Sequence, residues 1–348
     1  MLAALLEAPA RRNASLLEAA VNAFTSGTRR CRSAHSPELP RPRRGISTSP
    51  LLAMGPTPVW DTVGPAAALG TARAVEADGP QLEAGKLQRV VWVCWTGHNP
   101  MPAHLRLCLQ TIRRNAGLPV ILVTPANLLD YVPEPHPVYP FLHLAHRADY
   151  LRCYLLHNYG GVYLDVDTIC LRSLSGLFDQ LDTYEAVGYD GSQWMEYVGI
   201  SCMGPFRPHS DVTTLWFNAL HGKLSERAPE IFAREMDLFY WQEILRDIFL
   251  PVSLIFQPRI SKALRAMNPE QEQLWSVEPF QEVLRQTPVD DMHILILNNA
   301  NYGSALEHLS AHTILTGPAV LSQLLRHALR AADDPSQAAA LSAAMAPF

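Results

Sequence analysis

Two aspartates near the middle of the chain, Asp165 and Asp167, carry the strongest chemical signal in the sequence. They close an apolar segment, residues 162–166, which the pattern predicts to be a β-strand. Because side chains alternate along a strand, Tyr163, Asp165 and Asp167 are expected to share one face. Two unpaired carboxylates held this close repel each other and lose hydration, and a divalent cation removes that conflict. The spacing therefore predicts a Mn²⁺ or Mg²⁺ site, with water and substrate phosphates completing the coordination. The alternative is that the two carboxylates cap a turn or pair with Arg172.

A helix is expected directly before this strand, from about residue 146 to residue 159. Asp149 and Arg152 lie three residues apart, so they share one face of that helix. Their ordinary alternative is an ion pair on a solvated surface. Gly160 is placed to end the helix in the left-handed conformation. The apolar stripe of the helix consists of Tyr150, Leu151, Tyr154 and Leu155.

Upstream elements predict a sheet whose edge would present these side chains. Residues 90–95 and 118–124 are typical of strands buried on both faces, and residues 101–117 follow helical spacing. Strand, helix and strand in this order predict a parallel βαβ unit. Ligands of open α/β sheets bind beyond the carboxyl ends of the strands, where Asp165 and Asp167 would lie. Further strands are expected at 185–189, 197–203 and 292–299, and helices at 211–221, around 228–250 and at 317–329.

Composition and charge narrow the classes of function. The 348 residues are 48% hydrophobic and 18% charged, which is ordinary for a globular protein, and a net charge of −5 argues against a nucleic-acid partner. Six cysteines without a CxxC pair predict buried thiols rather than a disulfide framework or a zinc site. No run of 18 apolar residues occurs, so no transmembrane segment is expected, whereas peripheral membrane contact stays open.

Three parts of the chain are expected. Residues 1–85 are predicted to be a disordered leader and linker, residues 86–330 a single α/β domain, and residues 331–348 an Ala-rich flexible tail. Arg and Ser in residues 1–50 favour a targeting peptide, whereas Glu7 and Glu18 count against one, and that question stays open. The cytoplasm is the default expectation for localisation, with the Golgi lumen or another organelle as the alternative.

The combination "DYLR…YGGVYLDVD", residues 149–167, resembles the signature of glycosyltransferases with a DXD-containing sugar-binding region. That group includes capsular polysaccharide synthesis enzymes, yeast-type initiating mannosyltransferases and the large clostridial glucosylating toxins. The resemblance is dense over residues 90–172. It implies a GT-A-type, Rossmann-like mixed sheet flanked by helices. It also implies a metal-dependent, retaining hexosyltransferase that moves a sugar from a nucleotide-sugar donor to a hydroxyl acceptor in glycan or polysaccharide synthesis.

The resemblance implies a donor-binding role for each matching residue. Asp149 and Arg152 would hold hydroxyl groups of the donor sugar. Tyr163 and Asp165 would contact the ribose or the diphosphate of the nucleotide. Trp95, at the end of the first strand, would stack on the nucleobase. The donor would be a UDP- or GDP-sugar, and the acceptor a hydroxyl of a glycan, a lipid or a protein.

The metal site that the resemblance implies contains Asp167 as the direct ligand, with Asp165 beside it. Two departures from the family pattern are visible. Ala148 stands where the family usually has Ser. The segment "HTILTGPAVLS", residues 312–322, is not followed by the polar or His-containing element that commonly completes the site, which leaves a third protein contact to the metal open.

Two other classes of function stay open. Phosphohydrolases of the haloacid-dehalogenase type also place Asp-x-Asp after an apolar strand and use the first Asp as a nucleophile. Asp290 and Asp291 imitate the later acidic motif of those enzymes, but Thr168 and Ile169 depart from the Gly and Thr that usually follow the first motif. The other class is a non-catalytic member of the fold that binds a glycan or a nucleotide sugar.

Further candidates come from three other segments. Residues 191–205 are expected to return toward the donor sugar. The residues near 241 predict either an acceptor loop or a helical turn in the core. Two histidines four residues apart predict either a pair of ligands or ordinary surface or core histidines. The candidates are Glu196 and Ser201 near the donor, Trp241, Gln242 and Glu243 near the acceptor, and His308 with His312.

Overall fold

The computed structural model describes residues 82–329, except 192–197, 285–288 and 298. The chain divides into two units, Met1–Val63 and Gly64–Phe348, and all of the described residues lie in the second. The predicted tail and almost all of the predicted leader fall outside the described residues, so both stay predictions. Within the described residues, no helix is long and apolar enough to cross a bilayer.

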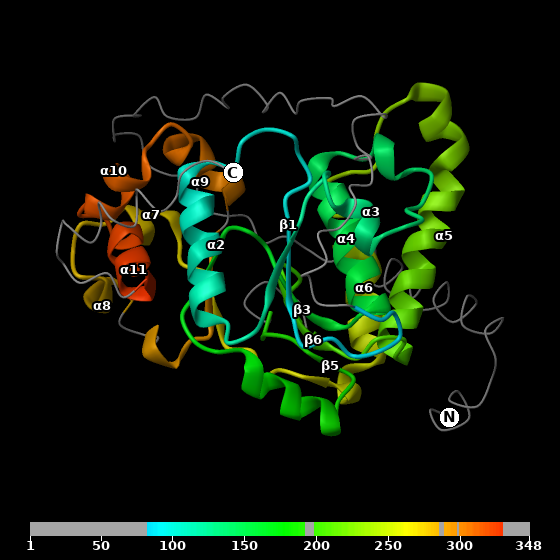
Figure 1. The fold of residues 1–348 in the computed structure, drawn as a ribbon, viewed down its shortest axis with the longest axis horizontal. Coiled ribbons are helices and arrows are strands. Elements are labelled where there is room, and N and C mark those ends of the chain that lie inside the picture. The colour runs from blue at the N-terminus through cyan, green and yellow to red at the C-terminus, as the bar shows by residue number, and fades with distance from the viewer. Residues whose placement is uncertain (1–81, 192–197, 285–288, 298, 330–348) are drawn as a thin grey trace, which may run out of the picture. The chain divides into compact units, whose positions relative to one another are not determined.

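A six-stranded mixed sheet forms the centre of the described unit (Figure 1). Its strand order is β2-β1-β3-β6-β5-β7. The β1–β2, β1–β3 and β5–β7 pairs are parallel, and β6 runs antiparallel to both β3 and β5. The predicted mixed α/β sheet is thereby confirmed. The strands are β1 (Val91–Cys94), β2 (Val120–Val123), β3 (Gly161–Leu164), β5 (Ala186–Val187), β6 (Cys202–Phe206) and β7 (Ile260–Ser261).

Helices cover both faces of this sheet (Figure 1). Helix α2 (Ala103–Asn115) joins β1 to its parallel neighbour β2, which confirms the predicted βαβ unit. On the other face, α4 (Leu144–Asn158) packs against α5 (Asp211–Arg234), and α5 packs against α6 (Arg246–Ile255). The shorter helical segments are α3 (Leu128–Tyr131), η3 (Tyr139–Phe141), η4 (Ser175–Asp182) and η6 (Gln257–Arg259).

A second, three-stranded sheet is built from β4 (Thr168–Cys170), β9 (Ile294–Ile296) and β8 (Ala266–Met267). Its strands bury both faces, since alternate residues enter two different hydrophobic clusters. One cluster lies under the C-terminal helices and takes Ile169, Leu295 and Leu297; the other lies under the main sheet and takes Cys170, Ile294 and Ile296. The C-terminal helices are α7 (Gln271–Trp275), α8 (Phe280–Val283), α9 (Asn299–Leu306), α10 (Ala311–Thr316) and α11 (Val320–Leu329), with η7 (Val289–Asp291) before β9.

Several predicted element boundaries are wrong. The expected strand at 197–203 begins only at Cys202, as β6. The expected strand at 162–166 ends at Leu164, and the chain turns at Val166 and Asp167, so strand alternation does not extend to Asp167. The expected helix around 228–250 is interrupted by the non-helical residues 235–245, which separate α5 from α6. The expected helix at 211–221 continues through Pro229 to Arg234 as the 24-residue helix α5. Pro removes one backbone donor, but the helix persists because its buried face is continuous on both sides of Pro229. That face includes Trp216, Leu220, Leu224 and Ile231.

Gly160 joins α4 to β3 in the predicted left-handed conformation, with φ of +67°. A Cβ atom at this position would lie 2.5 Å from the carbonyl oxygen of Phe206 and 2.9 Å from side-chain atoms of Leu87 and Pro208. We therefore expect Gly160→Ala to lower the free energy of unfolding by about 2 kcal/mol, measured by urea denaturation.

Gly222, inside α5, is the matched control for that substitution. A Cβ atom there would meet no neighbour within 4 Å. Gly222→Ala should stabilise the protein by about 0.5–1 kcal/mol, because Ala is the better helix former. Equal effects of the two substitutions would contradict the role given to Gly160.

Candidate functional site

The candidate site lies where β1 and β3 reach their carboxyl ends. Helix α4 runs back into the start of β3 through Gly160, so its first turns stand at the opposite, carboxyl end of that strand (Figure 1). The Thr96 hydroxyl donates a hydrogen bond to the Leu144 carbonyl oxygen at 2.7 Å. This bond ties the loop after β1 to the beginning of α4. Helix α4 and the ends of the two parallel strands therefore position the same group of side chains.

Arg152 is the centre of this group and is 3% exposed. Its Nη2 atom lies 2.8 Å from Oδ1 of Asp165 and 3.4 Å from Oδ1 of Asp149. Its Nη1 atom donates to the carbonyl oxygen of Ile200, and its guanidinium carbon lies 4.4 Å from the centre of the Tyr163 ring. The alternative of a solvated surface pair is wrong for Asp149 and Arg152, because both side chains are buried.

Burial and charge set the protonation of the two carboxylates. Burial raises the pKa of Asp149 to about 6, although Arg152 and His146 oppose the shift. Burial also raises the pKa of Asp165, against the guanidinium of Arg152 and a hydrogen bond from Tyr163. Burial by itself would lower the pKa of Arg152, but Asp165 raises it, and the guanidinium stays charged. One buried cation thus faces two carboxylates that titrate above their usual range.

Asp165 and Asp167 flank the tight turn that connects the two sheets. The backbone N–H of Thr168 donates to the carbonyl oxygen of Asp165 at 3.1 Å, and that of Leu297 donates to the carbonyl oxygen of Asp167 at 3.0 Å. Both aspartates are half-buried. The arrangement fits a hard divalent cation, because it offers carboxylate oxygens at a partly exposed turn. Among the residues that the structure describes, no group of three or more His, Cys, Asp or Glu is placed to hold a metal.

The remaining predicted residues are placed as follows. Trp95 is half-buried directly after β1, and its indole N–H donates to the Asn99 carbonyl oxygen at 2.9 Å. Its stacking on a nucleobase stays a prediction. Ser201 follows Ile200, whose carbonyl oxygen accepts a hydrogen bond from Arg152, so the chain at Ile200 lies against the candidate site. Its approach to a donor sugar stays a prediction. Glu196 lies outside the described residues.

The structure also decides between alternatives for Asp165, for the two histidines and for Trp241. Asp165 pairs with Arg152 and not with Arg172, which lies instead in a pocket of about 300 Å³ with Arg114. His308 lies in a turn after α9 and His312 in α10, and both are exposed, so they do not share the helical face that four-residue spacing suggested. Trp241 is 56% exposed in the turns before α6, and the expected helical core turn is wrong there. Gln242 and Glu243 lie in the same turns.

One polar pair near the site gave no signal in the sequence. His146, one turn before Asp149 on α4, bonds through Nδ1 to Oδ2 of Asp237 at 2.6 Å, and both side chains are buried. Burial would lower the pKa of His146, but Asp237 raises it; burial would raise the pKa of Asp237, but His146 lowers it. The two residues are 91 positions apart, so only the packing of α4 against the end of α5 brings them together.

Comparisons with known proteins agree with the resemblance seen in the sequence. Residues 74–193 match the model of a family described as capsular polysaccharide synthesis protein. No curated protein matches the chain. The matched residues contain β1, α2, α4 and the turn at Asp165 and Asp167.

The solved structures that match the chain are distant from it. PaToxG glycosyltransferase is 11% identical, with a TM-score of 0.30 over 51% of this chain and 69% of that one. The apo WbbM bifunctional glycosyltransferase is 12% identical, with a TM-score of 0.35 over 62% of this chain and 46% of that one. Galactosyltransferase LgtC, solved with donor and acceptor sugar analogues, is 13% identical, with a TM-score of 0.31 over 61% of this chain and 87% of that one. Over residues 74–193, the chain therefore resembles the capsular polysaccharide synthesis family.

Proposed function

We propose that the protein is a metal-dependent glycosyltransferase that moves a sugar from a nucleotide-sugar donor to a hydroxyl acceptor in polysaccharide synthesis. The observation that carries the proposal is the buried Arg152. It joins Asp149 on α4 to Asp165 at the end of β3, beside the turn that leads to Asp167. This is the edge of an α/β sheet at which ligands bind, and the family match covers it.

Each residue has a separate task in this proposal. Asp149 and Arg152 hold hydroxyl groups of the donor sugar, and Tyr163 and Asp165 contact the ribose or the diphosphate. Asp167, with Asp165, would hold Mn²⁺ or Mg²⁺. A cation bound there would act as a Lewis acid on the departing diphosphate. Trp95 would stack on the base of a UDP- or GDP-sugar.

The reaction exchanges one bond for another at the anomeric carbon of the sugar. The bond from this carbon to the diphosphate oxygen breaks, and a bond to the acceptor oxygen forms on the same face, with retention of configuration. The acceptor hydroxyl passes its proton to the departing diphosphate oxygen as the C–O bond to the diphosphate breaks. A phosphohydrolase mechanism would need Asp165 as a nucleophile, and the hydrogen bond from Arg152 at 2.8 Å makes its carboxylate less nucleophilic.

A thermal-shift screen of nucleotide sugars, with and without Mn²⁺, tests the proposal. We expect one donor to stabilise the protein only when the metal is present, by about 2.7 kcal/mol at a hundred times its dissociation constant. The positive donor is then incubated with the protein, and release of the nucleoside diphosphate is measured. Stabilisation by no nucleotide sugar would refute the proposal, whereas binding without release would favour a non-catalytic member of the fold.

The pKa of Asp149 gives the proposal a pH dependence. Below about pH 6 this carboxyl takes up a proton and no longer accepts hydrogen bonds from sugar hydroxyls as a carboxylate. We expect kcat/KM to fall by up to tenfold for each pH unit below 6. Asp149→Asn should lower kcat/KM at pH 7.5 and make its fall below pH 6 less steep. Asp165, whose pKa is also raised, would supply the remaining slope, and parallel profiles in the two proteins would show that Asp149 is not involved.

A further inference from the structure

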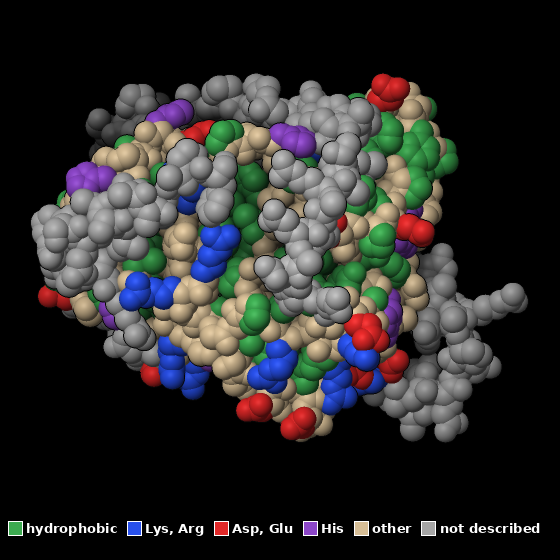
Figure 2. Space-filling view, viewed as in Figure 1, with side chains coloured by type: hydrophobic (Ala, Val, Ile, Leu, Met, Phe, Trp, Pro, Cys, Tyr) green, Lys and Arg blue, Asp and Glu red, His purple; other side chains and the backbone are tan. Residues whose placement is uncertain are grey.

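Two large aromatic side chains stand exposed in the loop after α5. Tyr240 is 58% exposed and Trp241 is 56% exposed, although aromatic residues of this size are usually mostly buried. They are consecutive in the chain, in the turns that lead to α6. Figure 2 shows further hydrophobic side chains over the upper part of α5, on the right of the view. Because the two rings are exposed, their packing does not hold the loop in place.

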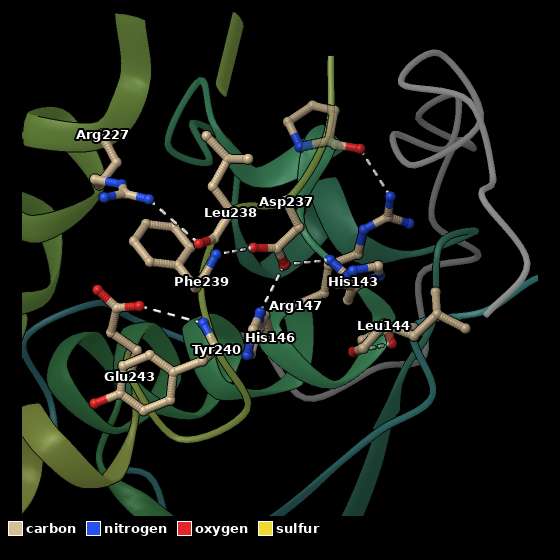
Figure 3. A network of polar contacts seen from close by, with 12 residues as sticks. His143, Leu144, His146, Arg147, Arg227, Asp237, Leu238, Phe239, Tyr240 and Glu243 are labelled. Atoms are coloured by element: carbon tan, nitrogen blue, oxygen red, sulfur yellow. Dashed lines mark hydrogen bonds and ion pairs between the residues drawn. The ribbon is translucent and has the colours of Figure 1, made fainter. Parts of the chain in front are cut away.

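Buried polar contacts hold the loop instead (Figure 3). The Asp237 carboxylate accepts hydrogen bonds from the backbone N–H of His143 at 2.7 Å and from that of Phe239 at 2.9 Å. It also bonds Nδ1 of His146 at 2.6 Å. Two of these three contacts, to His143 and His146, fix the beginning of the loop to the first turn of α4, and the third, to Phe239, closes the loop on itself.

The loop is also fixed to α5, in part through Arg227 (Figure 3). The backbone N–H of Tyr240 donates to Oε2 of Glu243 at 3.2 Å, and Oε1 of Glu243 pairs with Lys223 at 3.0 Å. Arg227 donates to the Leu238 carbonyl oxygen at 3.3 Å. Hydrogen bonds and an ion pair thus hold the backbone that carries the two rings, while the rings are exposed. A binding surface of this kind loses little conformational entropy when it takes a ligand.

The loop also lies beside the candidate donor site. His146 precedes Asp149 by three residues on α4, so the two lie on the same face of the helix. Each affects the titration of the other, since Asp149 raises the pKa of His146 and His146 lowers that of Asp149. The contact that anchors the loop is therefore one helical turn from the residues assigned to the donor sugar. A ligand resting on the loop would stand next to that sugar.

We propose that Tyr240 and Trp241 form a stacking platform for a neutral saccharide acceptor, an inference that rests on the proposed function. Sugar rings present apolar C–H faces to aromatic rings and leave their hydroxyls for other contacts. A membrane surface is the less suitable occupant, because acidic residues outnumber basic ones six to four over residues 223–247. Such a segment is repelled by anionic lipid head groups. The acceptor would extend from the platform toward the bound donor.

The test compares the double variant Tyr240→Ala/Trp241→Ala with the wild type on an array of neutral oligosaccharides. We expect the wild type to bind at least one of them, and the double variant to bind it at least tenfold more weakly. Trp275→Ala, in α7, is the control for loss of a partly exposed Trp and should bind like the wild type. The Mn²⁺-dependent thermal shift with a nucleotide sugar should be the same in all three proteins.

Other outcomes are equally informative. No saccharide binding by the wild type, or equal binding by the double variant, overturns the platform. Loss of sedimentation with phosphatidylcholine–phosphatidylserine vesicles in the double variant, without any saccharide binding, identifies a membrane contact instead and also overturns it. If nucleotide sugars fail to bind the wild type while the double variant still loses the oligosaccharide, the platform stands and the proposed transferase fails.

Discussion

Replacing Asp167 by Asn is expected to abolish Mn²⁺-dependent turnover while leaving the fold intact. The substitution preserves the shape of the side chain but removes the charge that would bind the cation. Loss of this contribution to the leaving diphosphate should cost several kcal/mol, which corresponds to a fall in kcat of about 10²- to 10⁴-fold. The measurements are initial rates with the donor found in the screen and the Mn²⁺ dependence of the melting temperature.

Asp182 at the end of η4 supplies the control for that experiment. It is exposed, and Asp182→Asn makes the same change in charge away from the turn between the sheets. This variant should keep the wild-type rate and the wild-type metal response. Should Asp167→Asn keep its affinity for Mn²⁺ and its rate, the assignment of the metal site would be refuted.

Replacing Arg152 by Ala is expected to have the largest effect on stability. The guanidinium is buried against Asp149, Asp165 and the carbonyl oxygen of Ile200. Its removal leaves the buried Asp149 and the half-buried Asp165 without their cation, and loss of one partner of a buried pair costs about 3–5 kcal/mol. We expect the free energy of unfolding to fall by that amount at pH 8, measured by urea denaturation.

The pH dependence of this loss separates charge from packing. Without Arg152 the pKa values of Asp149 and Asp165 should rise further above those of the unfolded chain. Stability is then lost as pH rises above about 4, the usual pKa of a carboxyl group, so the deficit of Arg152→Ala should be smaller at pH 5 than at pH 8. A deficit that is equal at both pH values would mean that Arg152 acts mainly through packing.

Arg234 on α5 is the comparison for an exposed ion pair. It pairs with Glu230 at 3.0 Å, and the two side chains are 59% and 44% exposed. Arg234→Ala should change the free energy of unfolding by less than about 0.5 kcal/mol. If Arg152→Ala lowers the free energy of unfolding no more than Arg234→Ala does, the buried cluster contributes no more than a surface pair.

Local patterns in the sequence predicted the part of the site that depends on neighbouring residues. Asp149 and Arg152 share a helical face because they are three residues apart, and Gly160 adopts positive φ where the helix must stop. The strand pattern failed at Asp167, because apolar residues alone do not reveal that Val166 and Asp167 form a turn. β3 ends early because the chain turns there and Thr168–Cys170 join the second sheet as β4.

Contacts between distant segments could not be predicted. The bond of His146 to Asp237 joins residues that carry no shared pattern, and it depends on how α5 lies along α4. The exposed position of Trp241 could not be predicted either. Its apolar side chain favoured a core position, but the end of α5 at Arg234 leaves it exposed in the following turns. Propensity and periodicity describe single elements, whereas these positions are set by packing between elements.

The turn between β3 and β4 has a consequence for how this protein can vary. Asp165 follows a strand of the main sheet, whereas the backbone of Asp167 is fixed by Leu297, just past β9. Under the proposed function, the nucleotide contact at Asp165 and the cation ligand Asp167 therefore depend on different sheets. Substitutions among the C-terminal helices are therefore expected to move Asp167 more than Asp149, Arg152 and Asp165. If the proposed roles hold, metal preference can change between homologues while donor choice is retained.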